Sequence, residues 1–339
     1  MGMPKEMRRL LITVLGGLAL MTTACGTPAE PNEPQPEEEV VPDRVTGCDG
    51  ATFLDPVGSL SEDGPWPVGA VNTLVSNSET EVWYPAVRGS QSGQDKHIYD
   101  IREVMPEAEG AKIPDAENPW HHCNCYRDLP LDENNGPYPV IIFIHGTGGY
   151  RGQSLKQMTH WASHGYVVVA MDHPGLNLGD LLALQTSQNL ERDVSNILVA
   201  LDALAGDLEF LKGHIDVNYL AMSGHSAGGT AVATEGDRAK VLIPMAAGGA
   251  QAGDRLAFSM VLAAQDDQIV NYASTQSDYN QTPAPKLFAG FASAGHLLFS
   301  DICELGRDGG GLVQIAIDHG VSNAFLAAGL YDGCNAGQL

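Results

Sequence analysis

Basic residues are scarce in this chain of 339 residues. Eighteen lysines and arginines stand against 42 aspartates and glutamates, and the formal net charge is −24. Nucleic acids and anionic lipid headgroups bind to surfaces that are rich in positive charge. The composition therefore argues against nucleic acid as a partner, and against electrostatic binding of the globular part to a membrane.

Near the N-terminus, no apolar run is long enough to span a bilayer. Residues 10–21 form an apolar stretch of twelve residues, whereas a transmembrane helix needs about 20. Basic residues precede this stretch and the small residues 22–24 follow it, which is typical of an export signal. With a cysteine next, residues 1–24 resemble a bacterial lipoprotein signal peptide. The resemblance implies that Cys25 is lipidated and anchors the protein at the bacterial cell envelope, facing the periplasm or the exterior. Ordinary secretion, with Cys25 in a disulfide, is the alternative.

The next segment has little apolar surface to bury. Residues 25–46 are rich in proline and glutamate, which predicts an extended, disordered tether. Residues 47–339 are predicted to form a single α/β domain, because strand-like and helix-like segments alternate from about residue 80. This domain contains a long insertion at about residues 86–137, rich in Pro, Asn, Asp and Gly.

Cysteines are few, and their number is odd once Cys25 is set aside. Those that remain are Cys48, Cys123, Cys125, Cys303 and Cys334. In an exported protein such cysteines predict disulfides. We expect Cys303 to pair with Cys334, and Cys48 to compete for Cys123 or Cys125, which leaves one thiol unpaired.

The segment 119–125 crowds histidine and cysteine together. Its adjacent histidines and Cys-x-Cys match no usual zinc spacing, and no second half of such a site follows. We therefore expect a disulfide-pinned surface loop and no metal site.

Apolar runs predict the strands of a mostly parallel, doubly wound sheet flanked by helices. The run at residues 138–144 is nearly unbroken, as expected for a strand buried on both faces. The other predicted strands span residues 79–85, 166–171, 240–245, 259–264 and 286–291, and another leads into residue 224. Helices are predicted at residues 153–164, 189–204, 227–235 and 312–330.

The strongest motif lies at residues 218–229. An apolar run ends in Gly224-His225-Ser226-Ala227-Gly228, and Gly-x-Ser-x-Gly is typical of a nucleophile elbow between a strand and a helix. A β-carbon at either glycine is expected to collide with neighbouring backbone. Ser226 is therefore the predicted nucleophile, with the N-terminus of a helix favouring negative charge beside it.

A serine nucleophile needs a base, and the base needs a carboxylate to orient it. His296 follows the last predicted strand, and Asp266 and Asp267 follow the strand before it. The order Ser226, Asp267, His296 is the one that this motif requires. Asp267 is preferred because the next residues resemble the turn after the acid in many α/β-hydrolases, and Asp266 is the alternative.

The oxyanion of an acyl-transfer reaction needs backbone donors. The N–H of Ala227, directly after the nucleophile, is one candidate. The second is the N–H of Thr147, in the loop that follows the strand at residues 138–144.

Together, the pattern His145-Gly-x-Gly-x-x-Arg151, the elbow and the two later site residues resemble the α/β-hydrolase superfamily over residues 79–330. Within it, the chain is similar to platelet-activating-factor acetylhydrolases, dienelactone-hydrolase-like esterases and bacterial cutinases or polyester hydrolases. Cutinase-like enzymes usually have an aromatic residue where this chain has Thr147, and a tryptophan where it has the small run 246–249. The aromatic clamp for a polyester is therefore missing.

The resemblance implies hydrolysis of a carboxylic ester through an acyl-enzyme, without cofactor or metal. The expected substrate is a small-molecule or lipid-like ester. A peptidase, thioesterase, acyltransferase or polyester hydrolase could use the same triad. A surface lipoprotein that only binds its ligand is the alternative outside catalysis.

Overall fold

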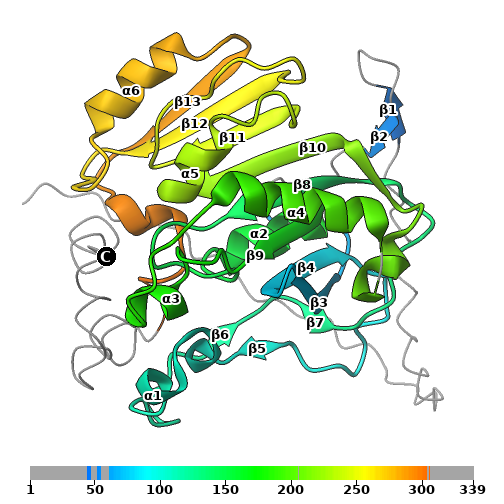
Figure 1. Cartoon of the computed structure of the whole chain (residues 1–339). Coiled ribbons are helices and arrows are strands. Elements are labelled where there is room, and N and C mark those ends of the chain that lie inside the picture. The colour runs from blue at the N-terminus through cyan, green and yellow to red at the C-terminus, as the bar shows by residue number, and fades with distance from the viewer. Residues whose placement is uncertain (1–43, 47–51, 55–60, 205, 304, 306–339) are drawn as a thin grey trace, which may run out of the picture. The chain divides into compact units, whose positions relative to one another are not determined.

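In the computed structural model of this chain, the described residues are 44–46, 52–54, 61–204, 206–303 and 305 (Figure 1). All of them belong to one unit, Pro42–Leu339. The predicted signal peptide, the lipidation site Cys25, most of the tether and the helix predicted at residues 312–330 lie outside the described residues.

Nine strands form one mixed sheet in the part of the chain that the structure describes. In spatial order they are β13 (Lys286–Phe291), β12 (Phe258–Ala264), β11 (Val241–Met245), β10 (Ile215–His225), β8 (Tyr138–Ile144), β9 (Val167–Met171), β4 (Ser78–Pro85), β3 (Val68–Val75) and β7 (Tyr126–Arg127). The first six are parallel to one another, β4 is antiparallel to β9 and to β3, and β7 is parallel to β3. This is a mostly parallel α/β-hydrolase sheet.

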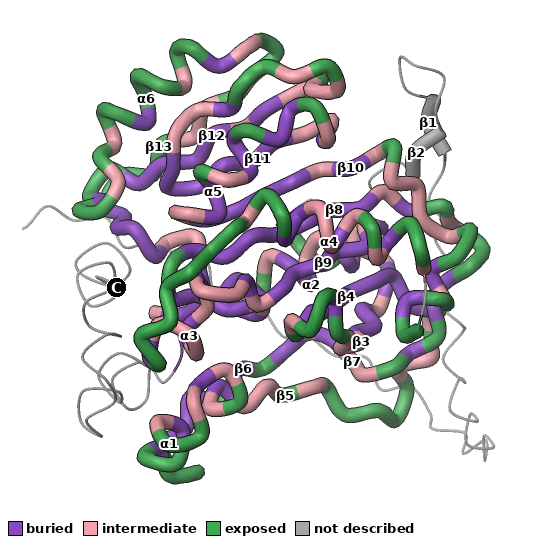
Figure 2. The backbone as a smooth tube through the Cα atoms, in the orientation of Figure 1, coloured by how far each residue is buried: buried purple, intermediate pink, exposed green. Residues whose placement is uncertain are grey.

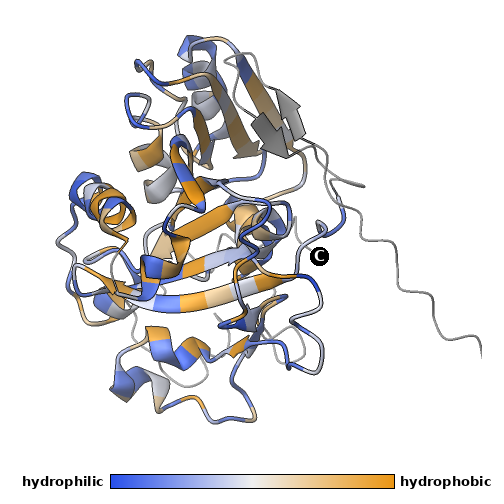
Figure 3. Cartoon of the chain, turned by 90° about the vertical axis from the view of Figure 1, so that its right-hand side faces the viewer, coloured by the Kyte–Doolittle hydropathy of each residue, from blue (hydrophilic) through white to orange (hydrophobic). Residues whose placement is uncertain are grey.

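Side chains of β8 alternate between two hydrophobic clusters, one on each face of the sheet. Ile142 packs in the cluster that contains Val194 and Ile197 of α4 (Leu190–Ala203). Phe143 packs in the other cluster, with Met158 of α2 (Leu155–Ser163). Helices thus cover both faces, and the central strands are buried (Figure 2). In Figure 3 the strands are largely hydrophobic and the connecting loops largely hydrophilic.

Shorter elements complete the described structure. The helical ones are η1 (Ile101–Val104), α1 (Glu107–Gly110), α3 (Leu178–Leu182), η2 (Gly206–Leu211), α5 (Ala227–Val232), α6 (Tyr272–Gln281) and η3 (His296–Phe299). Two small antiparallel pairs join β1 (Arg44–Thr46) to β2 (Thr52–Leu54) and β5 (Ile98–Tyr99) to β6 (His121–His122). The last three residues of the predicted tether are therefore strand β1. The insertion supplies β5, β6 and β7, and β7 extends the main sheet.

The cysteines of the insertion correct one prediction. Cys123 and Cys125 form a disulfide with each other, so neither is left for Cys48, which lies outside the described residues. Both cysteines are buried in the cluster that contains Met158, whereas Trp120 and His122 of the same segment are exposed, so the predicted disulfide is present and lies on the core side of this loop. The disulfide fills apolar space, as buried cysteine sulfur commonly does.

The disulfide between Cys303 and Cys334 remains a prediction. Cys303 is disulfide-bonded, and its expected partner Cys334 lies outside the described residues. Of the helices in the described ranges, none is at once long and apolar enough to cross a membrane.

Candidate active site

Ser226 stands at the turn between β10 and α5. Its φ is 55°, a left-handed conformation that is strained for a residue with a side chain. A β-carbon at Gly224 would lie 2.5 Å from the carbonyl of Gly228, and one at Gly228 would overlap the carbonyl oxygen of Ile144. The two glycines thus allow α5 to lie against the ends of β8 and β10, as the elbow motif predicts.

His296 begins η3, just after β13, and its Nδ1 lies 2.8 Å from Oδ2 of Asp267. The other carboxylate oxygen of Asp267 accepts the N–H groups of Ile269 and Val270, each at 2.8 Å. Asp267 is buried, whereas the neighbouring Asp266 is exposed. Of the two candidate acids, Asp267 is therefore the one that contacts the histidine.

The surroundings of Asp267 favour its charged form. Burial by itself raises the pKa of this carboxyl, but hydrogen bonds from His296 and from two backbone N–H groups outweigh burial and hold the pKa below its ordinary value. A charged carboxylate at Nδ1 keeps a proton on that nitrogen, which leaves Nε2 of His296 for proton transfer.

Ser226 is joined to this pair through its neighbour. The ring of His225 lies 4.7 Å from that of His296, centroid to centroid, and its Nε2 is 2.9 Å from the carbonyl oxygen of His296. Within the described ranges, no hydrogen bond links Ser226 directly to His296.

The oxyanion loop, residues 145–151, approaches the elbow closely. A β-carbon at Gly146 would lie 3.1 Å from Cβ of Ser226. The N–H groups of Gly148 and Gly149 donate to carbonyl oxygens of Leu176 and Gly146. Among the described residues, the turn and loop hydrogen bonds between backbone groups include none from the N–H of Thr147 or of Ala227. The side chain of Thr147 is exposed.

The end of the oxyanion loop is anchored by charge. The backbone N–H of Arg151 donates to Asp172 at 2.6 Å, and its guanidinium bonds the other oxygen of the same carboxylate. The guanidinium also lies 3.8 Å from Glu81, which is fully buried on β4. These contacts tie the loop to the end of β9 and to the middle of β4.

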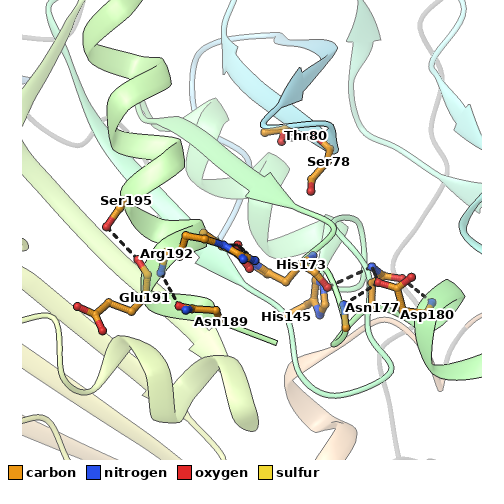
Figure 4. A network of polar contacts seen from close by, with 12 residues as sticks. Ser78, Thr80, His145, His173, Asn177, Asp180, Asn189, Glu191, Arg192 and Ser195 are labelled. Atoms are coloured by element: carbon orange, nitrogen blue, oxygen red, sulfur yellow. Dashed lines mark hydrogen bonds and ion pairs between the residues drawn. The ribbon is translucent and has the colours of Figure 1, made fainter. Parts of the chain in front are cut away.

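The start of the loop rests on a second buried group (Figure 4). His145 accepts the N–H of His173 at 3.1 Å, and Nδ1 of His173 lies 3.4 Å from the carboxylate of Asp193 on α4. All three residues are buried. Burial, with His173 nearby, lowers the pKa of His145 well below its ordinary value, so this ring is neutral.

The insertion reaches the site in a way that the sequence did not predict. His121 is buried, with Nε2 at 3.3 Å from Asp301 and Nδ1 at 3.3 Å from the hydroxyl of Tyr150. Asp301 lies just after η3 and also accepts the N–H of Lys156 at 2.9 Å. One buried histidine thus joins the loop at residues 145–151 to the segment after His296. In the described part of the chain, no group of three or more His, Cys, Asp and Glu side chains is arranged to hold a metal ion.

Comparisons with known proteins concern the family and the fold of this chain. The sequence model of the Chlorophyllase family matches residues 129–265, a segment that contains the oxyanion loop and the elbow. No curated protein matches the chain. Among solved structures, the ferulic acid esterase from Streptomyces cinnamoneus is similar, with a TM-score of 0.50, 16% identity, and coverage of 82% of this chain and 90% of that one. At this identity the likeness concerns the fold. The chain has the α/β-hydrolase fold, and the family match supports a carboxylic ester hydrolase.

Proposed function

We propose that this protein hydrolyses carboxylic esters with Ser226 as nucleophile, His296 as base and Asp267 as the acid that orients the base. The observation that carries the proposal is the buried bond between His296 and Asp267 beside a serine at a strained elbow. A protein that only binds its ligand has no need of that strain, which argues against a non-catalytic surface lipoprotein.

The reaction would proceed by double displacement. Nε2 of His296 takes the proton of the Ser226 hydroxyl as Oγ attacks the ester carbonyl. The tetrahedral oxyanion lies toward the N–H groups of Thr147 and Ala227, and the loss of one such donor typically costs about 3–4 kcal/mol of transition-state stabilisation. The imidazolium then protonates the leaving alcohol.

Water completes the cycle. His296 takes a proton from a water molecule that attacks the acyl-enzyme, and then returns the proton to Ser226 as the acid leaves. The substrate we propose is a small-molecule or lipid-like ester. Peptidase, thioesterase, acyltransferase and polyester hydrolase activities could use the same triad, and Thr147 in place of an aromatic residue argues against the polyester.

The test uses a series of p-nitrophenyl esters of rising chain length and a fluorophosphonate probe. The wild type is expected to hydrolyse at least one ester and to be labelled at Ser226. Ser226→Ala should lose both properties while its circular dichroism spectrum is unchanged. Labelling at another residue, or turnover by the folded variant, would refute the assignment. The preferred acyl length identifies the substrate class.

We also propose that Cys25 is lipidated and holds the enzyme at the cell envelope. The support is the basic, apolar and small-residue order of residues 1–24 before Cys25. Expressed in bacteria, the chain should incorporate labelled palmitate and sediment with membranes, and Cys25→Ser should abolish the label. Membrane association without any acyl label would contradict this anchor.

A further inference from the structure

Two buried side chains that the proposed mechanism does not use lie between the oxyanion loop and the catalytic histidine. They are Gln153, 1% exposed, and His225, 2% exposed. The N–H of Gly146 lies 3.4 Å from Oε1 of Gln153. Nε2 of Gln153 lies 3.2 Å from Nδ1 of His225, whose Nε2 lies 2.9 Å from the carbonyl oxygen of His296.

The two ends of this chain of contacts are backbone groups, which fixes the direction of every hydrogen bond between them. The N–H of Gly146 can only donate, so Gln153 must present its oxygen there and its NH₂ group to His225. Nδ1 of His225 must then accept, so the ring proton is on Nε2. That proton is donated to the carbonyl of His296, which can only accept.

A neighbouring hydroxyl fixes the same orientation of the amide independently. Ser154 Oγ donates to the carbonyl of Phe299 at 2.8 Å, so toward Gln153 it offers a lone pair. The atom of Gln153 that faces this lone pair, at 3.5 Å, is Nε2. Both contacts therefore place the NH₂ group on the side of His225.

Glycines of the oxyanion loop hold the two side chains in place. A β-carbon at Gly149 would overlap Oε1 of Gln153, and one at Gly146 would lie 3.1 Å from Nδ1 of His225. Little room remains for either side chain to turn. Burial, and then the nearby His296, lowers the pKa of His225 to about 3, which agrees with a neutral ring.

We propose that Gln153 and His225 are positioning residues: they set the backbone of His296 against the oxyanion loop, so that base and oxyanion donors keep their spacing. This inference rests on the proposed esterase function. The reacting groups of an enzyme must be held closely, because a misplacement of 1 Å can lower the rate about 100-fold. Neither residue is expected to contact the substrate, so the loss should appear in kcat and not in KM.

The first test reads the proton directly and needs no activity. In the full-length chain labelled with ¹⁵N-histidine, ¹⁵N–¹H correlation spectra at pH 7 should show His225 with a protonated Nε2 and a bare Nδ1. The signal is assigned by its absence in His225→Gln. A proton on Nδ1, or a fully charged ring, would overturn the direction of the chain and with it the proposal.

The second test separates positioning from packing with a matched pair of variants. His225→Gln keeps an acceptor for Gln153 and a donor for the carbonyl of His296, and should keep kcat within about threefold of the wild type. His225→Phe keeps a ring but loses both bonds, and should lower kcat about 100-fold with KM unchanged. Both are compared at equal folded fraction, with the ester that the wild type hydrolyses best.

Gln153 is tested in the same way. Gln153→Leu should lower kcat like His225→Phe, and Gly149→Ala should do so by displacing Gln153. In a Gln153→Ala background the effect of Gly149→Ala should shrink, because its target is gone. If the effects of Gly149→Ala and Gln153→Ala on kcat are additive, Gly149→Ala does not act by displacing Gln153.

The outcomes distinguish the two proposals. The positioning role is refuted if His225→Gln and His225→Phe lower kcat equally, or if the variants raise KM and leave kcat unchanged. The esterase function stands in either case. A wild type without turnover and without labelling of Ser226 refutes the proposed function, and the positioning role falls with it.

Discussion

Asp267 holds His296 with one carboxylate oxygen and is itself held by the other. The 2.8 Å contact to Nδ1 of His296 uses Oδ2, and Oδ1 accepts the backbone N–H groups of Ile269 and Val270. Because both oxygens are engaged, the carboxylate cannot rotate without losing a bond. It can therefore fix the tautomer of His296 and stabilise the imidazolium that forms during the reaction.

The first prediction concerns this pair. Asp267→Asn keeps an oxygen for the two N–H groups but can turn its NH₂ toward His296, which favours the wrong tautomer. A comparable change in a serine protease lowered kcat about 10⁴-fold, and we expect a loss of that order, or about 5 kcal/mol. Steady-state kinetics at equal folded fraction measures it.

Asp266→Asn is the matched control, because Asp266 is exposed and adjacent. Its kcat should stay close to that of the wild type. A larger loss in Asp266→Asn than in Asp267→Asn would reverse the choice of acid. No loss in either variant would mean that the acid lies elsewhere.

The central fold could be predicted because its strands are buried on both faces. The predicted strand at residues 138–144 is β8, and that at 166–171 contains β9, whose five residues are all buried. Continuous apolar runs of this kind have few other uses in a soluble domain. Because parallel strands place their C-terminal ends at one edge, the site residues after β8, β10, β12 and β13 could also be expected to meet.

Elements with weaker patterns were not predicted. Strand β3 (Val68–Val75) has three half-buried residues and one exposed residue near its end, so no continuous apolar run marks it. Helix α6 is mostly polar and buries Thr275 alone among its residues, so no apolar face marks it.

Contacts between segments that are far apart in the chain also could not be predicted from the sequence. His121 and Asp301 are 180 residues apart, and Gln153 and His225 are 72 apart. Periodicity reports only how a residue faces its own helix or strand. The contact between the insertion and the segment after His296 is therefore visible only in the structure.

The second prediction concerns the elbow. Gly228→Ala would place a β-carbon against the carbonyl oxygens of Ile144 and His145. Because these oxygens belong to the backbone at the end of β8, they cannot shift unless the strand moves. We expect a loss of unfolding free energy on the order of 3 kcal/mol or more, measured by urea titration, together with loss of esterase activity.

Gly248→Ala is the control for the elbow variant. Its β-carbon would meet only the end of the Asp278 side chain, at 3.3 Å. Its stability should remain within about 0.5 kcal/mol of the wild type. Equal stability of Gly228→Ala and Gly248→Ala would show that α5 is not packed as described.

The third prediction concerns the buried carboxylate of Glu81. It bonds the guanidinium of Arg127 and the hydroxyl of Tyr99, and it lies 3.8 Å from Arg151. Glu81→Ala would leave the half-buried guanidinium of Arg127 without this carboxylate, and the loss of one partner of a buried ion pair typically costs about 3–5 kcal/mol. Urea unfolding should show this loss, whereas Glu79→Ala, an exposed carboxylate on the same strand, should change stability little. A small effect at Glu81 would mean that water or other groups compensate Arg127 and Arg151.

The last prediction concerns pH and His225. Burial lowers the pKa of this ring to about 3 in the folded protein, whereas an unfolded histidine has a pKa of about 6.5. Between these values the unfolded chain binds more protons, so the contribution of His225 to stability is complete above about pH 6.5 and is lost as pH falls toward 3.

The groups that face His225 set the window for this experiment. His145 and His296 face this ring and are retained in His225→Gln, so both are common to the two proteins that are compared. Asp267 also faces the ring, and hydrogen bonds from His296 and two backbone N–H groups hold the pKa of its carboxyl below the ordinary value of an aspartate. Urea titrations between pH 4.5 and 7.5 should therefore isolate His225.

The difference in unfolding free energy, wild type minus His225→Gln, should be flat above pH 7 and fall below it by up to about 1.4 kcal/mol per pH unit. A difference that stays constant across this range, or rises as pH falls, would show that the folded protein accommodates a charged His225, and would contradict a ring that accepts a hydrogen bond at Nδ1.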